Sequence, residues 1–354
     1  MPEDAYNSEQ IQVISGIEGV RNRPGMYFGR TDSFGTEQFV YELVSNTLDC
    51  YLSGTATFVS VEIEEGNITV VDNGLGLPFE LPSEIRGVSL ATEFLTTLHS
   101  TGSRDGHAPH VHARNIHGVG LAILNAASSQ MKIQSWRDGV LWEQRFERGV
   151  SLCKPTIIDR GTGRGTRIEV TPDPELFQRS QPRLDVVRRN LFETAHLVKG
   201  IEIRLNRERF YASQGLVQLL PFMGASVNLY DRHTNFLPFH TTVKSDRVLI
   251  DAVACGSITT KQPLIYSWVN GGVSVEEGSH VNGFLKALQQ VNWQPALVMI
   301  HVVMFDPEFA GPTRTKLVAP KIAKIVRAAL QEPLEHYCSN RRQADSDDKL
   351  MPFH

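Results

Sequence analysis

The chain has 354 residues, of which 41% are hydrophobic and 21% are charged, and its formal net charge at pH 7 is −4. These values fit a globular protein of roughly two domains and exclude an overall basic field of the kind that attracts nucleic acid. The four cysteines lie far apart in sequence, which excludes a C-x-x-C zinc or redox motif. The chain shows no signal-peptide pattern and no apolar run of roughly 20 residues, so we expect a cytoplasmic protein without membrane contact.

The first part of the chain alternates helical and strand patterns. Residues 1–35 are predicted to be irregular, and a helix over about residues 36–52 ends at Ser53-Gly54, a common C-terminal stop. The elements expected after it, in chain order, are a hairpin over 58–64 and 67–71, a helix over 89–99, a helix over 121–127, a hairpin over 131–136 and 140–147, and a strand over 167–171.

A proline-rich connection at 172–182 leads to a predicted helix over 183–198 and a strand over 201–205. The predicted domains are 1–212 and 213–354. The elements expected in the second domain are strands over 247–254 and 262–269, a helix over 279–290, a strand over 297–305, a long helix over 318–338, and a polar tail over 339–349. The strand–helix–strand run within it predicts a parallel β-α-β unit with a right-handed crossover.

The helix over 36–52 carries the most informative polar residues. Glu42, Ser45, Asn46 and Asp49 fall within one arc of its helical wheel. The opposite side is filled by Phe39, Val40, Leu43, Val44, Thr47 and Leu48. A carboxylate one turn from an amide oxygen can provide a water-activating base beside a Mg²⁺ ligand. The alternative is an ordinary surface helix whose polar side faces water.

Two glycine motifs follow this helix. Asp72 ends a predicted strand and precedes Gly74 and Gly76, so its carboxylate could accept a hydrogen bond from an exocyclic amine while the glycines let a flat ring approach. The alternative is a turn aspartate that caps its own backbone. Gly118 and Gly120 open the helix over 121–127, whose N-terminus favours an anion, and no G-x-x-x-x-G-K-[ST] loop offers another phosphate site.

With these three motifs in this order, the chain resembles the GHKL ATPases, and most of all the B subunits of DNA gyrase and topoisomerase IV. The segments that carry the resemblance are 19–27, Glu42 with Asn46, 72–78, 117–120, 278–284 and Asp306-Pro307. The resemblance implies an α+β fold: a GHKL (Bergerat) α/β sandwich that binds ATP, followed by a smaller α/β transducer domain with a long C-terminal helix.

The resemblance also implies roles for individual residues. Glu42 would be the general base, oriented by Gln38, Asn46 would ligate Mg²⁺, and Arg314 would face the γ-phosphate. The nucleotide would be bound by Asn46, Asp49, Asp72, Gly76, Leu77, Pro78, His117, Gly118, Val119, Gly120, Arg137, Thr166 and Tyr6. Tyr6 and Ile11 match an N-terminal arm that crosses to the partner protomer of a homodimer when ATP binds.

Several positions depart from the family pattern. Gln38 stands where many relatives have a histidine, and 312–314 reads Pro-Thr-Arg instead of Gln-Thr-Lys. The segment 101–103 lacks an expected lysine that would contact phosphate. Leu75 and Cys50 occupy the positions of a family ion pair, and their joint replacement predicts an apolar pair that leaves the pocket folded.

We therefore expect a Mg²⁺-dependent ATPase of the type II DNA topoisomerase class that dimerises when ATP binds. No Toprim or DNA-gate module is recognisable, so this polypeptide alone is not expected to cleave DNA. Expected partners are duplex DNA and a separate Toprim or cleavage subunit or full-length topoisomerase. The candidate phosphate contacts are Arg183, Arg188, Arg189, Arg341 and Arg342. The alternative is a non-hydrolysing paralogue that binds nucleotide and regulates or protects a partner topoisomerase.

Overall fold

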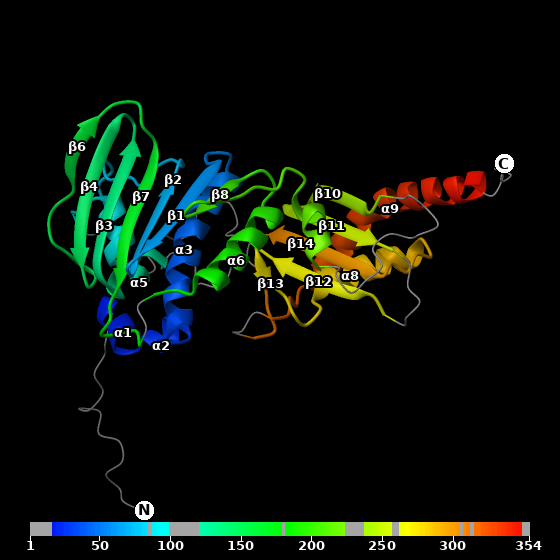
Figure 1. The fold of residues 1–354 in the computed structure, drawn as a ribbon, viewed down its shortest axis with the longest axis horizontal. Coiled ribbons are helices and arrows are strands. Elements are labelled where there is room, and N and C mark those ends of the chain that lie inside the picture. Colours follow the sequence, from blue (N-terminus) through cyan, green and yellow to red (C-terminus); the bar gives the residue numbers. More distant parts are fainter. Residues whose placement is uncertain are drawn as a thin grey trace, which may run out of the picture.

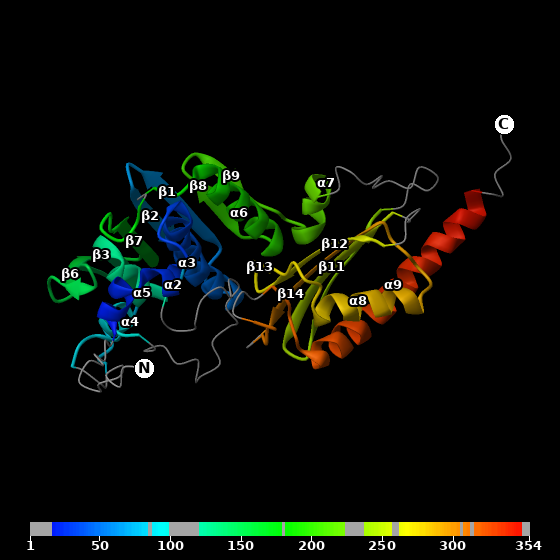
Figure 2. The same ribbon diagram turned by 90° about the horizontal axis from the view of Figure 1, so that it is seen from below.

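The computed structural model describes residues 16–83, 87–98, 120–178, 181–223, 237–256, 262–304, 307–311 and 315–348. Figure 1 shows two α/β layers side by side, each built on its own sheet. The strand order is β5-β4-β3-β7-β2-β1-β8-β9 in the nine-stranded sheet, where β6 pairs with β4, and β10-β11-β14-β12-β13 in the five-stranded sheet. Helix α6 (Leu184–Leu197) lies where the two layers meet (Figures 1 and 2).

The N-terminal segment is helical, so the prediction of an irregular chain over 1–35 was wrong for its described part. Helix α1 (Ile17–Asn22) is followed by α2 (Pro24–Phe28), which begins at the proline because its fixed φ suits a first helical position. Phe28 stacks on Phe39 at 5.3 Å between ring centroids. These helices are too short to be stable alone, and tertiary packing of this kind holds them.

Helix α3 (Ser33–Leu52) confirms the long helix and its end at Ser53. It starts before residue 36 because Asp32 caps it, accepting a hydrogen bond from Phe34 N at 2.9 Å. Every residue from Gly35 to Ser45 is buried, including the polar ones. The polar side of this helix is therefore not an ordinary face in water.

The nine-stranded sheet confirms both predicted hairpins, β1–β2 and β3–β4, which pair in antiparallel fashion. Its strands are β1 (Phe58–Glu64), β2 (Asn67–Asp72), β3 (Ser128–Arg137), β4 (Val140–Glu147), β5 (Val150–Ser151), β6 (Thr156–Arg160), β7 (Gly165–Pro172), β8 (Glu202–Leu205) and β9 (Glu208–Phe210). The strand β6 was not predicted, because all five of its residues are exposed and show no alternation of burial. Helices α3, α4 (Leu90–Thr96) and α5 (Gly120–Ala126) pack on one face of this sheet (Figure 2).

The five-stranded layer contains the predicted β-α-β unit, since β12 and β14 are parallel neighbours. Its elements are η2 (Gly215–Leu219), α7 (Leu220–Met223), β10 (Phe239–Ser245), β11 (Val248–Cys255), β12 (Leu264–Val269), β13 (Gly272–Val273), α8 (Ser279–Gln290), β14 (Leu297–Met304) and α9 (Pro320–Asp348). The segment expected to be a polar tail is helical as far as Asp348, so α9 is longer than predicted. The division at residue 212 stays a prediction.

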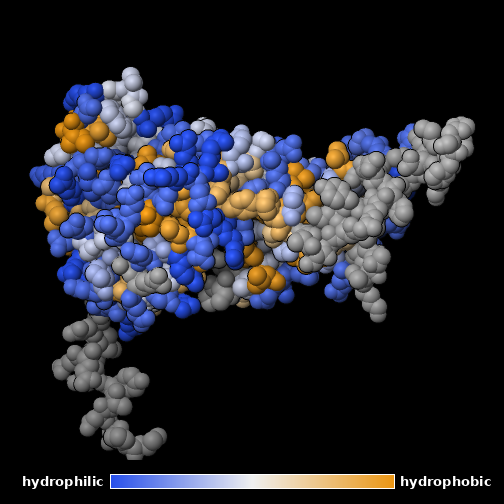
Figure 3. All heavy atoms as spheres, in the orientation of Figure 1, coloured by the Kyte–Doolittle hydropathy of each residue, from blue (hydrophilic) through white to orange (hydrophobic). Residues whose placement is uncertain are grey.

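Every residue of β14 is buried, as expected for the central strand of a sheet with cover on both faces. Figure 3 shows a mostly hydrophilic surface over the nine-stranded layer, with smaller hydrophobic areas toward the junction of the layers. None of the helices in the described part of the chain has the length and apolar character needed to cross a membrane.

Candidate functional site

The candidate base Glu42 and the glycine motif at the start of α5 lie against each other. Glu42 is 8% exposed, and a Cβ placed on Gly120 would come within 2.6 Å of its Oε2. Only glycine therefore fits at position 120 without displacing the carboxylate. Asn46, one turn further along α3, is exposed. The buried carboxylate of Glu42 and the exposed amide of Asn46 thus lie one helical turn apart on the same side of α3.

Asp72 lies at the end of β2, and Gly74 and Gly165 pack closely against it. Its Oδ1 accepts a hydrogen bond from Gly74 N at 2.6 Å, and Thr166 hydrogen-bonds it through both backbone and side chain. Burial raises the pKa of this carboxyl to about 6, although those bonds and the charge of Arg164 act in the opposite direction. Gly165 is required here, because its φ is +114° and a Cβ would lie 2.0 Å from Asp72 O.

The loop after β2 is fixed against β3. Leu77 N donates to Ser135 Oγ at 2.6 Å, and Arg137 donates to Gly76 O at 3.1 Å. Arg137 also forms an ion pair of 2.8 Å with Glu80. Gly76 has φ +79°, and a Cβ there would lie 2.3 Å from Trp136 O. Gly76, Leu77 and Arg137 therefore come together as one wall beside Asp72.

Pro78 joins this wall to the next helix, since its carbonyl accepts a hydrogen bond from Ala91 N at 3.2 Å in α4. The residue near the C-terminal end of α3, Asp49, is half-buried and close enough to Cys50 to help raise the pKa of that thiol, although burial is the largest cause. Most of the described residues that the resemblance assigned to a nucleotide site thus lie along α3 or on the loop after β2.

Two further residues hold this site together and were missed from the sequence. Arg164 donates to Asn73 O at 2.9 Å and to Thr55 O, which fixes the loop after β2 to the end of α3. Ser135 is fully buried and binds both the N–H and the carbonyl of Leu77. The flanking glycines of Gly163-Arg164-Gly165 were a signal for a tight backbone approach, whereas a strand serine such as Ser135 gives none.

Two residues at which the chain departs from the family pattern have contacts of their own. Gln38 is buried, and its amide nitrogen donates to Phe34 O at 3.3 Å, one turn back along α3. That donor is therefore engaged within its own helix. Leu75 is 51% exposed, and the expectation that its replacement together with Cys50 leaves the pocket folded stays a prediction. Cys50 hydrogen-bonds the backbone of Leu75.

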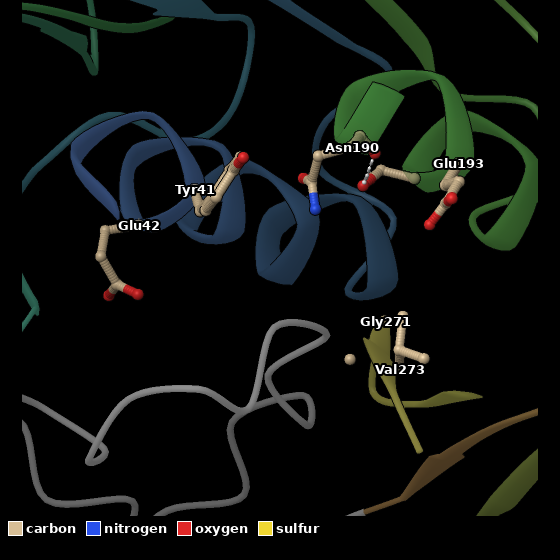
Figure 4. Close-up of a pocket in the computed structure, with 8 residues that line it drawn as sticks. Tyr41, Glu42, Asn190, Glu193, Gly271 and Val273 are labelled. Carbon is tan, nitrogen blue, oxygen red and sulfur yellow. Dashed lines mark hydrogen bonds between the residues drawn. The ribbon is translucent and has the colours of Figure 1, made fainter. Parts of the chain in front are cut away.

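A pocket beside Glu42 lies between the two layers. It is lined by Tyr41 and Glu42 of α3, Asn190, Glu193 and Thr194 of α6, and Gly271, Gly272 and Val273 at the turn into β13 (Figure 4). Figure 4 shows these residues on three separate elements: Tyr41 and Glu42 on α3, Asn190 and Glu193 on α6, and Gly271 and Val273 at the turn. The candidate base therefore faces the α5 N-terminus on one side and the five-stranded layer on the other.

The remaining predicted site residues lie outside the described part of the chain. These are Tyr6, Ile11, His117, Gly118, Val119 and Arg314.

Of the arginines proposed to contact phosphate, four have partners within the chain. Arg183 pairs with the buried Glu37 at 2.8 Å, and Arg188 pairs with Glu208 at 2.7 Å. Arg341 lies over the Trp293 ring, and Arg342 donates to Val291 O. Their role in binding DNA remains a prediction, and these partners would compete with phosphate.

Residues 31–176 match the family described as "Histidine kinase-, DNA gyrase B-, and HSP90-like ATPase". The DNA gyrase B subunit of Streptococcus pyogenes serotype M18 is 30% identical over 94% of this chain and 55% of its own length. The DNA gyrase B subunit of Thermotoga maritima is 29% identical over 94% of this chain and 57% of its own length. The chain thus spans about half the length of the curated relatives it matches.

Solved structures show the same fold. The 43K ATPase domain of Thermus thermophilus gyrase B superposes with a TM-score of 0.78 at 23% identity, covering 93% of this chain and 91% of that one. The topoisomerase IV ATP-binding domain of Francisella tularensis has a TM-score of 0.76 at 22% identity, covering 94% of each chain. The predicted fold and the resemblance to the GHKL ATPases, gyrase B in particular, are confirmed.

Proposed function

We propose that this gyrase-B-like GHKL region binds ATP and hydrolyses it with Mg²⁺, acting as a clamp that dimerises in the ATP-bound state. The observation that carries the proposal is the convergence of three motifs far apart in sequence. Glu42 lies against Gly120, and Asp72 lies near Cys50, eight residues further along the same helix. Eight residues span about 12 Å of helix. The middle of α3 would therefore serve the phosphates, and its C-terminal end the adenine ring.

The surroundings of Asp72 suit an adenine ring. With its pKa at about 6, the carboxyl is mostly ionised at pH 7 and can accept a hydrogen bond from an exocyclic amine. Thr166 stands beside it as a second polar contact. Arg137 borders the same wall through its bond to Gly76 O.

The surroundings of Glu42 suit attack by water on the terminal phosphate. A carboxylate that is buried but faces a pocket can take the proton of an attacking water molecule. Asn46 offers an exposed amide oxygen one turn away, and Mg²⁺ is typically held by few protein oxygens together with water and substrate phosphates. When bound, the ion would neutralise charge that develops on the phosphates. Gly120, at the helix N-terminus, would approach the same anion.

A second candidate function is a nucleotide-binding module that does not hydrolyse ATP and regulates or protects a partner topoisomerase. The observation that favours it is the glutamine at position 38, whose amide nitrogen donates a hydrogen bond to Phe34 O within its own helix. A glutamine in this arrangement supplies no positive charge near Glu42. Nucleotide would then bind without a positive charge from position 38 beside the base.

ATP turnover by the purified chain tests the two functions against each other. The measurement uses Mg²⁺, a range of protein concentrations, and the variants Glu42→Gln and Glu62→Gln, the second being an exposed carboxylate on β1. Turnover that rises more steeply than linearly with protein, survives Glu62→Gln and disappears in Glu42→Gln supports a dimerising ATPase. Tight nucleotide binding with equal, negligible turnover in all three proteins overturns hydrolysis and supports the binding module.

The partners remain part of the proposal. A homodimer would form through the arm that contains Tyr6 and Ile11, and the clamp would act on duplex DNA or with a Toprim or cleavage partner. Sedimentation with and without a non-hydrolysable ATP analogue tests the dimer. A shift from monomer to dimer that is lost on deletion of residues 1–15 supports the arm, and a monomer under both conditions overturns it.

A further inference from the structure

The turn between β12 and β13 forms the side of the Glu42 pocket that belongs to the five-stranded layer. Gly271 lies in this turn, Gly272 and Val273 form β13, and all three line the pocket (Figure 4). The opposite side is α3, with Tyr41 and Glu42. The position of this turn therefore determines the shape of the space beside the candidate base.

His301, in the middle of β14, connects this turn to α6. Its ring is 2% exposed, with Nδ1 at 3.1 Å from Leu197 O and Nε2 at 3.1 Å from Gly271 N. A backbone N–H only donates and a carbonyl only accepts, so the ring must carry its proton on Nδ1 and accept at Nε2. Burial lowers the pKa of His301 to about 4, which keeps the ring neutral at physiological pH.

The same turn is fixed to the strand that carries His301. Asn270 is 1% exposed and forms two hydrogen bonds to Met304, from Nδ2 to the carbonyl at 2.9 Å and from the Met304 N–H to Oδ1 at 2.8 Å. Beyond the turn, Ser274 Oγ and Glu276 N both donate to Thr315 O, at 3.1 and 3.0 Å. These bonds hold the turn to its own layer at several points. Of the bonds described here, only those of the His301 ring connect the turn to α6.

We infer that His301 is a positioning residue that holds the β12–β13 turn against α6 and so sets the shape of the pocket beside Glu42. The consequence for catalysis rests on the proposed ATPase function, whereas the hydrogen-bonded bridge does not. α6 belongs to the junction of the layers and contributes Asn190, Glu193 and Thr194 to the same pocket. A bridge between its last carbonyl and the turn therefore fixes two walls of the pocket relative to each other.

Two amide variants separate the two halves of the bridge. The side chain of His301→Gln reaches as far as Nε2, so its oxygen can still accept from Gly271 N. The shorter His301→Asn reaches only as far as Nδ1, so it can donate to Leu197 O but leaves the Gly271 N–H without this acceptor. Val302→Ala, at the next position of the same fully buried strand, is the matched control for a general loss of packing.

In steady-state ATP turnover we expect both variants to lower kcat by about tenfold or more with little change in KM, because each breaks one half of the bridge between α6 and the turn. The effect should fall on kcat because the turn borders Glu42, not Asp72. At temperatures below its unfolding transition, Val302→Ala should have the same kcat as the unmodified chain. Equal kcat in the Asn variant and the unmodified chain, or equal losses in all three variants, would overturn the inference.

Hydrogen exchange at the Gly271 amide tests the bridge without reference to activity. We expect slow exchange in the unmodified chain and in His301→Gln, and at least about tenfold faster exchange in His301→Asn. An unmodified chain that lacks turnover but shows this pattern contradicts the proposed ATPase and supports the bridge. Fast exchange of Gly271 in the unmodified chain contradicts the bridge, whatever the turnover.

Discussion

Arg21 and Asp173 form an ion pair of 2.9 Å that joins α1 to the residue following β7. The same carboxylate, fully buried, also binds Arg148 at 3.0 Å. Arg21 in addition donates to Ala126 O, the last residue of α5. A single buried aspartate therefore anchors the N-terminal helix to two elements of the nine-stranded layer, which explains why a segment without strong helical patterning is ordered.

Replacing Asp173 should destabilise the chain. For Asp173→Asn we expect a loss of about 2–3 kcal/mol in the free energy of unfolding, below the roughly 3–5 kcal/mol typical of a broken buried pair because both arginines keep contact with water. Glu175→Gln, at a largely exposed carboxylate, should cost about 0.5 kcal/mol or less. Urea titrations of the three proteins measure the difference, and equal midpoints would contradict the anchor.

The same aspartate predicts a loss of stability in acid. Burial alone would raise its pKa, but hydrogen bonds from Glu175 N and Arg21 and the charges of Arg21 and Arg148 outweigh it, so the pKa is lowered. A depressed pKa contributes stability that is present above the unfolded pKa of about 4 and is lost as pH falls below it. Urea midpoints between pH 5 and pH 3 should therefore fall less in Asp173→Asn than in the unmodified chain.

Nucleotide affinity should depend on pH through Asp72. Because its pKa is raised to about 6, the carboxylate needed to accept from an amine is lost as pH falls below that value. The sign for stability is opposite: the ligand-free fold gains from the protonated form and loses that gain as pH rises through about 6. Calorimetric titration with ADP from pH 5 to pH 8 should show affinity rising with pH, and this dependence should be absent in Asp72→Asn.

Gly165 should tolerate no side chain. Gly165→Ala would place a Cβ 2.0 Å from Asp72 O at φ +114°, so we expect a loss of several kcal/mol or failure to fold. Gly54→Ala is the matched control, since Gly54 also has positive φ, +76°, but no atom within 4 Å of its Cβ position. Its cost should be about 1 kcal/mol. Similar denaturation midpoints for both variants would show that contact with Asp72 O does not matter.

Asn46 should separate metal binding from folding. Its side chain is exposed, so Asn46→Ala should change the free energy of unfolding by about 0.5 kcal/mol or less. If the amide oxygen ligates Mg²⁺, the variant should lose the Mg²⁺-dependent part of ATP affinity and keep the part measured in EDTA. Unchanged Mg²⁺ dependence would remove Asn46 from the ligand set.

Local sequence patterns predicted those helices and strands whose ends and burial are set by their own residues. Ser53-Gly54 ends α3, and the alternation over 58–64 and 67–71 forms β1 and β2, because turn chemistry and period-two burial are properties of short segments. The fully exposed β6 has no such signal, and α1 depends on Asp173, more than 150 positions away. Long-range contacts of this kind leave no local pattern to recognise.

The same distinction applies to the candidate site. Asp72 with its glycines could be recognised because close backbone approach demands glycine at fixed positions. Ser135 could not, because only its register opposite Thr166 brings it to the loop after β2. The exposure of Leu75, at 51%, is set by the path of its loop rather than by its apolar side chain. The side-chain bond of Gln38 likewise depends on rotamer choice, which residue type does not determine.

The burial of every residue from Gly35 to Ser45 has a consequence for any comparison of related genes. Substitutions along this stretch would be removed by selection for packing alone, so invariance of Glu42 among relatives would say little about catalysis. Asn46 lies just outside the stretch and faces solvent, where drift is tolerated. An asparagine or glutamine kept at position 46 in distant relatives would therefore be stronger evidence for selection on nucleotide binding than an invariant Glu42.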